Sequence, residues 1–120
     1  MSAKSPGTKA DRLEFLQGTL EMLVLKTLLT GERHGYGIAQ SIRLASNEAF
    51  LIEAGSLYPA LQRLELQGLI KADWKSSDTG RRARFYKLTA AGRKKLAASV
   101  SRWEEFAAAI ALVLHPSEAE

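Results

Sequence analysis

Side chains that can hydrogen-bond to nucleotide bases and phosphates concentrate in two neighbouring segments of this sequence. Over residues 56–67 the apolar residues share one side of a predicted helix, and hydroxyl, amide and guanidinium groups occupy the other side. Over residues 70–88 two short alternating runs flank a basic loop, which predicts a β-hairpin. The candidate DNA-contact residues in these segments are Ser56, Tyr58, Pro59, Gln62, Arg63, Arg81, Arg82 and Arg84.

The predicted helix over residues 56–67 has the chemistry to read bases in a DNA major groove, into which an α-helix fits. Arg63 suits guanine or a phosphate, and Gln62 suits adenine. Tyr58 and Ser56 suit a phosphate or the methyl group of thymine. For this helix taken alone, the alternative is a solvated face of an ordinary amphipathic helix. Leu66 fits a groove poorly, and we expect it to pack beneath the hairpin or against a neighbouring edge.

The charge distribution favours the hairpin as a phosphate-binding element. The 120-residue chain has a net charge of +4, but residues 71–95 hold nine basic and two acidic residues, a net charge of +7, which leaves −3 for the rest. Phosphate contact requires charge gathered on one element. Arg81 and Arg82 lie near the predicted loop tip, where they can enter a minor groove or hold the DNA backbone. The alternative is a solvated loop, with Arg84 on an ordinary strand surface.

Residue types argue against other classes of chemistry. The chain has no cysteine, which rules out disulfides, thiolate metal sites and cysteine nucleophiles. Its two histidines, His34 and His115, have no nucleophile, phosphate-binding or zinc motif around them. We therefore predict no catalytic residue, metal, cofactor or enzyme activity. No apolar run approaches the roughly 20 residues that span a bilayer, and the N-terminus lacks the apolar core of a signal peptide. A cytoplasmic protein without membrane association is expected.

The first half of the chain is predicted to hold two helices. Thr19 is the predicted N-cap of a first helix over residues 20–29. Residues 34–37, with two glycines, predict a turn before a short second helix over residues 38–45. Residues 50–52 predict a brief strand or an extended link to the next helix.

The second half is predicted to hold two further helices around the hairpin. Ser56 is the predicted cap of the third helix, with Pro59 in its first turn and Gly68 at its end. Thr89 is the predicted cap of a last helix over residues 90–114. The predicted fold is mostly α with a small β-hairpin (α+β), a winged helix-turn-helix followed by a long C-terminal dimerisation helix. The predicted divisions are a disordered arm (1–12), the winged helix-turn-helix (13–89), the C-terminal helix (90–115) and a tail (116–120).

The last predicted helix carries a seven-residue repeat of apolar residues, which is typical of helices that pair with other helices. Its length, about 37 Å at ~1.5 Å per residue, exceeds what the small preceding domain covers. We predict that it joins two subunits, and folding back on its own domain is the alternative. Trp103 could line a cavity between subunits and stack a planar ligand, or be a tightly packed interface residue. This repeat, the seam, consists of Leu96, Val100, Trp103, Ala107, Ile110 and Leu114.

Five motifs, in this order and spacing, resemble the PadR family of bacterial transcriptional regulators. The resemblance extends over residues 13–114, nearly the whole predicted folded part. The motifs are Leu16-Gln17-Gly18-Thr19-Leu20, His34-Gly35-Tyr36-Gly37-Ile38, Gly55-Ser56-Leu57-Tyr58-Pro59-Ala60-Leu61, Leu64-Glu65-x-x-Gly68-Leu69-Ile70 and Arg81-Arg82-x-Arg84-Phe85-Tyr86-x-Leu88-Thr89-x-x-Gly92-Arg93.

The resemblance implies a homodimeric repressor that binds a pseudo-palindromic operator in double-stranded DNA. Family members use the third helix and the wing on DNA, which maps onto the eight candidate residues above. The chain resembles the short branch, in which some members bind planar aromatic effectors at the dimer interface, and Trp103 matches the aromatic position used there. The alternative is a winged-helix protein-interaction module, with Leu66, Trp74 and Phe85 as its docking surface. Neither the patterns nor the resemblance identifies the operator, the regulated genes or the effector.

Overall fold

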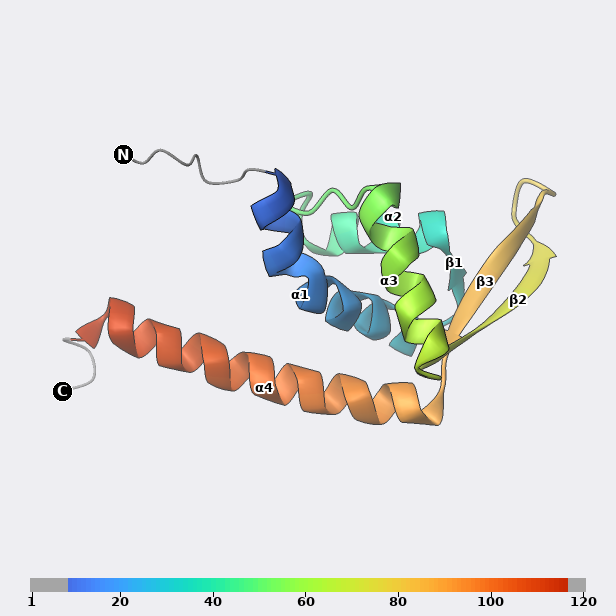
Figure 1. Cartoon of the computed structure of the whole chain (residues 1–120). Helices are drawn as coiled ribbons and strands as arrows, with labels where there is room; N and C mark the ends of the chain where they lie inside the picture. Colours follow the sequence, from blue (N-terminus) through green and yellow to red (C-terminus); the bar gives the residue numbers. More distant parts are fainter. Residues whose placement is uncertain (1–8, 117–120) are drawn as a thin grey trace.

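The secondary structure follows the predicted order with one additional strand (Figure 1). The computed structural model describes residues 9–116, and the side chains of residues 18–116. Within this part of the chain, the fold consists of four helices and a small three-stranded sheet, which confirms the predicted α+β class. The elements are α1 (Lys9–Leu29), β1 (Arg33–His34), α2 (Gly35–Ala45), α3 (Ala54–Leu66), β2 (Ile70–Ser76), β3 (Arg82–Leu88) and α4 (Ala90–Leu114).

The first helix begins earlier than its capping pattern predicts. α1 starts at Lys9 and runs through Thr19, so the prediction that Thr19 caps it is wrong. Residues 9–12 of the predicted arm are helical, whereas residues 1–8, and residues 117–120 of the predicted tail, lie outside the described residues. Gly18 costs only about 1 kcal/mol inside a helix. The helix-forming residues on both sides of Gly18 outweigh that cost.

The third helix also begins earlier than predicted. Its N-cap is Glu53, without a side-chain capping bond, and not Ser56. Pro59 therefore lies beyond the first turn, where it deprives the carbonyl of Gly55 of its helical donor. Gly55 itself is exposed. The predicted end is confirmed, because Gly68 follows the helix with a left-handed φ of +74°.

The predicted hairpin is confirmed, and it forms part of a larger sheet. β2 and β3 pair antiparallel from Ile70 opposite Leu88 to Ser76 opposite Arg82. The additional strand β1 pairs with β3 on its other edge, which gives the order β1-β3-β2. Residues 77–81 form the exposed turn between β2 and β3. The hairpin extends away from the helices as the wing of a winged helix-turn-helix (Figure 1).

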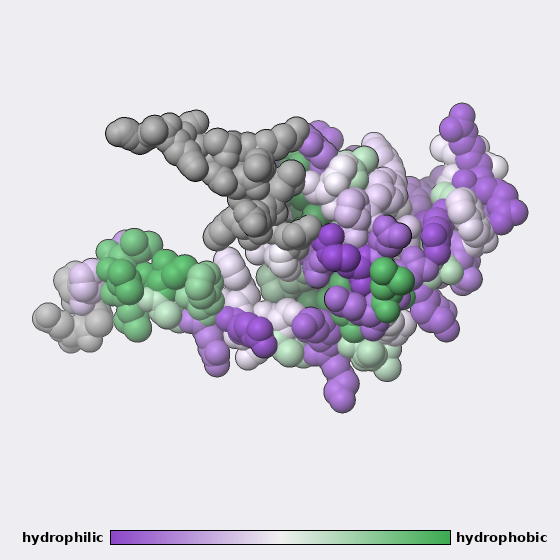
Figure 2. Space-filling model, viewed as in Figure 1, coloured by the Kyte–Doolittle hydropathy of each residue, from purple (hydrophilic) through white to green (hydrophobic). Residues whose placement is uncertain are grey.

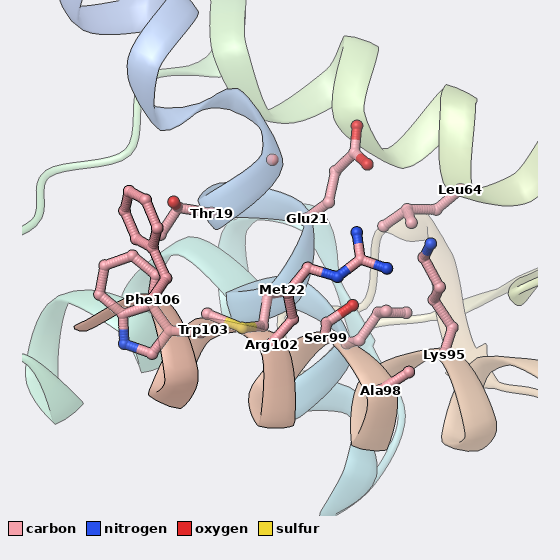
Figure 3. A pocket seen from close by; sticks show the side chains of 12 residues that line it. Thr19, Glu21, Met22, Leu64, Lys95, Ala98, Ser99, Arg102, Trp103 and Phe106 are labelled. Carbon is pink, nitrogen blue, oxygen red and sulfur yellow. The ribbon is translucent and has the colours of Figure 1, made fainter. Parts of the chain in front are cut away.

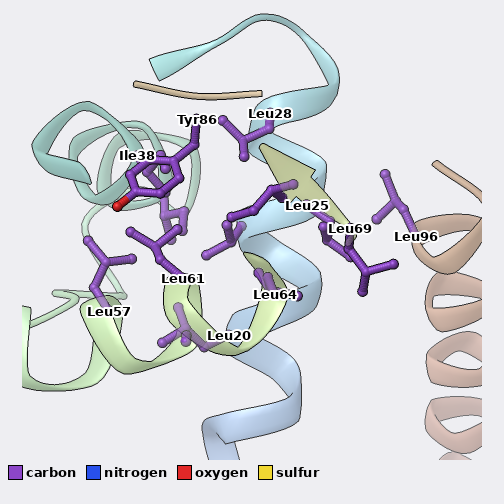
Figure 4. Packing of buried hydrophobic residues seen from close by; sticks show 14 residues of the cluster. Leu20, Leu25, Leu28, Ile38, Leu57, Leu61, Leu64, Leu69, Tyr86 and Leu96 are labelled. Carbon is purple, nitrogen blue, oxygen red and sulfur yellow. The ribbon is translucent and has the colours of Figure 1, made fainter. Parts of the chain in front are cut away.

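An apolar core joins α1, α2, α3, the base of the hairpin and the start of α4 (Figure 4). The buried face predicted for α3 is confirmed, because its four core residues are at most 2% exposed. Burial of this kind is the main source of stability in a small domain. The core residues are Leu20, Val24, Leu25, Leu28, Ile38, Ile42, Leu57, Ala60, Leu61, Leu64, Leu69, Ile70, Tyr86 and Leu96.

The last helix is attached to the domain along its first half and then extends beyond it (Figure 1). The predicted cap is confirmed, since the Thr89 hydroxyl accepts from the Gly92 amide at 3.0 Å. The same hydroxyl donates to the carbonyl of Gly68 at 2.8 Å. At Gly92 an added Cβ would lie 2.1 Å from the Leu69 carbonyl oxygen, so only glycine allows this close approach. Among the described helices, none is long and apolar enough to cross a membrane.

Candidate nucleic-acid interface

The helix α3 presents a mostly polar face to solvent. Tyr58, Pro59 and Gln62 are exposed, and Ser56 is half-buried. Leu66 is 81% exposed, so the prediction that it packs beneath the hairpin is wrong. The hairpin leaves the body near the end of α3 (Figure 1). The exposed side of α3 is therefore open to another molecule at Tyr58, Pro59, Gln62 and Leu66.

Arg63 lies apart from the other candidate contact residues of α3. Its Nε donates to Oε2 of Glu21 on α1 at 2.7 Å, and the two side chains are 36% and 23% exposed. The guanidinium group therefore joins α3 to α1, on a different side of the helix from Gln62. Because 42 residues separate the two partners, the helix pattern around Arg63 gives no sign of this contact.

The segment predicted as a turn is the beginning of α2, so that prediction is wrong. His34 is the N-cap, and its Nδ1 accepts from the Gly37 amide at 3.0 Å. The His34 ring also meets Phe85 edge to face, with centroids 5.1 Å apart. His34 therefore serves as a cap and a packing residue. A Cβ on Gly35 would lie 2.6 Å from the hydroxyl of Tyr58, so glycine lets the start of α2 approach α3.

A hollow of about 1270 Å³ lies between α2, α3 and the wing. It brings Tyr58 together with the three candidate arginines of the wing, but it does not include Ser56, Pro59, Gln62 or Arg63. Three polar residues of α2 also line it, Tyr36, Gln40 and Ser41. Sequence patterns did not indicate them, because they do not show which side of α2 faces the wing. The polar residues that face the hollow include Tyr36, Gln40, Tyr58, Arg81, Arg82 and Arg84.

The two arginines at the wing tip are exposed and, among the described residues, have no carboxylate partner. The guanidinium carbon of Arg82 lies 5.8 Å from the centroid of the Trp74 ring, a cation–π arrangement. The backbone carbonyl of Arg81 accepts from the Ser77 amide at 2.7 Å, which closes the turn. Both side chains can thus approach phosphates without first breaking an ion pair.

The other basic residues near the wing's middle are paired with carboxylates. Nη2 of Arg84 donates to Oε2 of Glu65 at 2.6 Å, and Lys75 pairs with Glu32. Tyr86 lies one pleat nearer the base on the same face as Arg84. Burial raises the pKa of the Tyr86 phenol above its ordinary value of 10.0, whereas the charge of Arg84 acts in the opposite direction. Tyr86 is therefore a neutral anchor for the wing at neutral pH.

A second hollow, a groove of about 490 Å³, separates α1 from α4 (Figure 3). The rings of Trp103 and Phe106 have centroids 6.0 Å apart, and both point toward α1 near Thr19. Met22 adds an apolar side chain from α1, and Arg102 adds a charge from α4. The groove therefore offers aromatic surface beside polar groups, which is the usual composition of a small-molecule site.

The predicted seam divides into two parts. Leu96 is 5% exposed and belongs to the core, and Val100 packs against that core. Both residues pack within the protomer, and the role of the six seam positions in a subunit interface stays a prediction. Farther along the helix, Trp103 and Ile110 are each 41% exposed, and only Ala107 is half-buried. The outer half of α4, residues 103–114, carries the hydrophobic surface seen at its free end (Figure 2), which comprises Trp103, Phe106, Ile110, Leu112, Val113 and Leu114.

The described side chains contain no group of three His, Asp or Glu residues placed to hold a metal ion. The polar side chains of the hollow and the groove carry hydroxyl, amide, guanidinium, ammonium and imidazole groups and a few carboxylates. Such groups suit hydrogen bonding and charge contact.

Comparison with known proteins gives concordant results. The chain matches the transcriptional regulator PadR-like family over residues 24–98. It is 33% identical over 94 residues to transcriptional regulator Rv3488 of Mycobacterium tuberculosis, with 78% of this chain and 84% of that protein covered. A transcriptional regulator from Clostridium thermocellum superposes with a TM-score of 0.74 at 30% identity, with 81% of this chain and 94% of the other covered. A PadR family transcriptional regulator from Eggerthella lenta superposes with a TM-score of 0.71 at 30% identity, with 88% of this chain and 89% of the other covered.

Proposed function

This chain belongs to the PadR-like family of transcriptional regulators, and we propose that it acts in the cytoplasm as a homodimeric repressor on a pseudo-palindromic operator. As a member of this family it is a transcriptional regulator and not an enzyme. In this proposal the chain binds DNA through α3 and the wing, pairs with a second chain through α4, and is released from DNA by a small effector.

The observation that carries the proposal is the hollow between α2, α3 and the wing. Tyr58 of α3 faces the same hollow as Arg81 and Arg82 of the wing tip. A helix that enters the major groove places its front residues against base edges, and arginines beside it neutralise phosphates. Gln62, exposed one turn after Tyr58, supplies the amide that suits adenine.

The outer half of α4 supports dimer formation. Large apolar side chains cluster there on a helix that extends beyond its own domain (Figure 2). Clusters of this kind on a small protein mark interaction sites. Pairing two such helices brings two copies of α3 to one duplex. The half-sites of the operator then lie about one helical turn, ~34 Å, apart.

The groove beside Trp103 supports binding of a planar aromatic effector. Its volume of about 490 Å³ lies within the range of small-molecule sites, and Trp103 and Phe106 offer ring faces for stacking. An effector that binds there releases DNA only if it prefers one arrangement of the dimer. Titration with the planar dye proflavine tests this part. Saturable binding by the parent and none by Trp103→Ala is expected, and absence of binding by the parent overturns it.

Selection of bound DNA from a random pool tests the core of the proposal. The expected outcome is an enriched pseudo-palindrome with half-sites about one turn apart. Gln62→Ala should relax sequence preference at one position in each half-site, because its amide no longer selects a base. Gln67→Ala, an exposed glutamine just past the end of α3, is the matched control and should select the parental sequence. A pool without enrichment, or single unpaired half-sites, contradicts the proposal.

A protein-interaction module without DNA binding is the second candidate, because two large apolar side chains on this side of the protein are exposed. Leu66 is 81% and Trp74 59% exposed. A gel-shift assay against genomic fragments with competitor DNA separates the candidates. A shifted band that resists nonspecific competitor supports the repressor, whereas no band at low salt favours the interaction module.

A further inference from the structure

We propose that two ion pairs on opposite faces of the wing, Arg84–Glu65 and Lys75–Glu32, fix its direction relative to α3. Glu65 and Glu32 are then positioning residues, and Arg84 and Lys75 are not phosphate contacts. This inference rests on the proposed function, since it divides the basic residues of the wing into those that orient it and those that bind DNA.

The register of the hairpin places the two pairs on opposite faces. Arg84 lies directly opposite Trp74 in the β2–β3 ladder, so their side chains share one face. Lys75, the next residue after Trp74, points to the other face because successive residues of a strand alternate. It lies opposite Ala83. The two cationic side chains therefore lie at the same distance along the hairpin and project from its opposite faces.

Their partners belong to separate parts of the body. Glu65 is the penultimate residue of α3, and Glu32 lies in the link between α1 and β1. Nη2 of Arg84 and Oε2 of Glu65 are 2.6 Å apart. Farther out, at residues 76–82, the described part of the chain shows no ion pair or hydrogen bond between wing and body. The two pairs are thus the outermost polar contacts that join the wing to the body.

This arrangement has a mechanical and an electrostatic consequence. Exposed ion pairs are individually weak, but two of them on opposite faces restrain swing in both directions. A phosphate that approaches Arg84 has to compete with the Glu65 carboxylate, which already accepts from Nη2 of the guanidinium group. Arg81 and Arg82 have no such competitor among the described residues and lie farther along the wing. They are therefore the wing residues that neutralise phosphates, while Arg84 sets where they point.

The salt dependence of DNA binding separates the two roles. Each phosphate neutralised contributes about −0.9 to the slope of log K against log salt concentration. On a mixed-sequence duplex, Arg81→Ala should flatten the slope by about 0.9, and the matched variant Arg84→Ala should leave it unchanged. Equal flattening by both variants overturns the division of roles. Failure of the parent to bind this duplex contradicts the proposed function instead, and the next measurement then judges the ion pairs alone.

Distances between spin labels test the orienting role without DNA. The chain has no cysteine, so Thr79→Cys at the wing tip and Gln67→Cys after α3 supply the two label sites. Labelled chain is diluted with unlabelled chain, so that only distances within one chain are measured. Glu65→Gln and Glu32→Gln should broaden the distance distribution, because each removes one restraint. Glu48→Gln, which removes the partner of Arg43 away from the wing, is the matched control. Unchanged widths in both wing variants overturn the proposal.

Discussion

The two halves of α4 share one apolar repeat but have different surroundings. In the inner half, residues 90–102, Leu96 is 5% exposed and contributes to the protomer core. In the outer half, Trp103 and Ile110 are each 41% exposed and Leu114 is 66% exposed. A single sequence pattern therefore serves two purposes. The inner half fixes the helix to its own domain, and the outer half presents surface for the proposed partner chain.

The comparison teaches what a repeat of apolar residues can and cannot predict. A repeat with spacings of three and four predicts which side of a helix is apolar. It does not identify the surface that covers that side, because this depends on where the rest of the domain ends. Here the domain ends near Val100, which packs against its core. Substitutions in the inner half should therefore act on folding, and substitutions in the outer half on association.

The largest effect is expected from Gly92→Ala in the inner half. The new Cβ would lie 2.1 Å from the Leu69 carbonyl oxygen and 2.7 Å from a methyl carbon of Leu88. Since a backbone atom cannot move as a side chain can, the start of α4 must shift. We expect a loss of about 4 kcal/mol or more in the free energy of unfolding. Urea denaturation measures it, and Gly18→Ala, with no atom within 4 Å of the new Cβ, is the control.

The next largest effect is expected from Leu96→Ala. Truncating a buried leucine removes apolar contacts and leaves a cavity, so we expect a loss of about 2 to 3 kcal/mol in the free energy of unfolding. The loss should be the same at all protein concentrations, because Leu96 packs within one protomer. Leu112→Ala is the matched control in the outer half, where the side chain is 58% exposed. At protein concentrations low enough for the chain to be monomeric, it should change the free energy of unfolding by less than about 0.5 kcal/mol. Comparable losses for both variants would contradict the division of α4.

A smaller effect, on association and not on folding, is expected from Ile110→Asp. A carboxylate in the proposed subunit interface should weaken dimer formation by at least about tenfold, which corresponds to ~1.4 kcal/mol. Sedimentation should detect monomers, while circular dichroism retains the helical signal. Ser101→Asp places the same charge on the opposite side of α4 and should leave the dimer intact. A dimer that persists in Ile110→Asp would remove the outer half of α4 from the interface.

Local patterns predicted those features whose causes are local. The Gly68 helix end, the Thr89 cap and the hairpin were predicted because a few neighbouring residues determine each of them. The buried side of α3 was predicted from its spacing. The start of α1 was missed, since a good cap such as Thr19 does not end a helix that its neighbours favour. The apolar residues Phe106, Ile110 and Val113 of α4 also follow one another at steps of four and three. The exposed apolar surface beside the seam could therefore have been predicted from the sequence.

Contacts between distant residues were not predictable from those patterns. Strand β1 has two residues, too few for any periodicity, and exists because β3 pairs with it. Arg63 belongs to the polar run of α3, but its guanidinium group is bound to Glu21 on another helix. Arg84 likewise carries a carboxylate partner on α3. The sequence therefore indicated which polar and basic residues lie on α3 and the wing, while the packing of the helices determines which of them are paired with carboxylates. Their contact with DNA stays a prediction.

The smallest effect is expected from Thr89→Ala, at the inner end of α4. The variant loses the capping bond to Gly92 and the bond to the Gly68 carbonyl. Loss of an N-cap costs about 1 kcal/mol. Thermal denaturation measures the change. Thr89→Ser keeps the hydroxyl group, so its free energy of unfolding should fall by only about a few tenths of a kcal/mol.

The same variant sharpens the comparison between the halves of α4, because it weakens the attachment of the helix without changing its outer surface. If association depends on the outer half alone, the dimer dissociation constant of Thr89→Ala should equal that of the parent under conditions where both are folded. Sedimentation at several protein concentrations measures it. A weaker dimer would mean that the direction in which the inner half holds α4 is part of the interface. The two halves would then move as one rigid helix. A change of direction at the cap would displace the outer half some 20 residues away, about 30 Å at ~1.5 Å per residue.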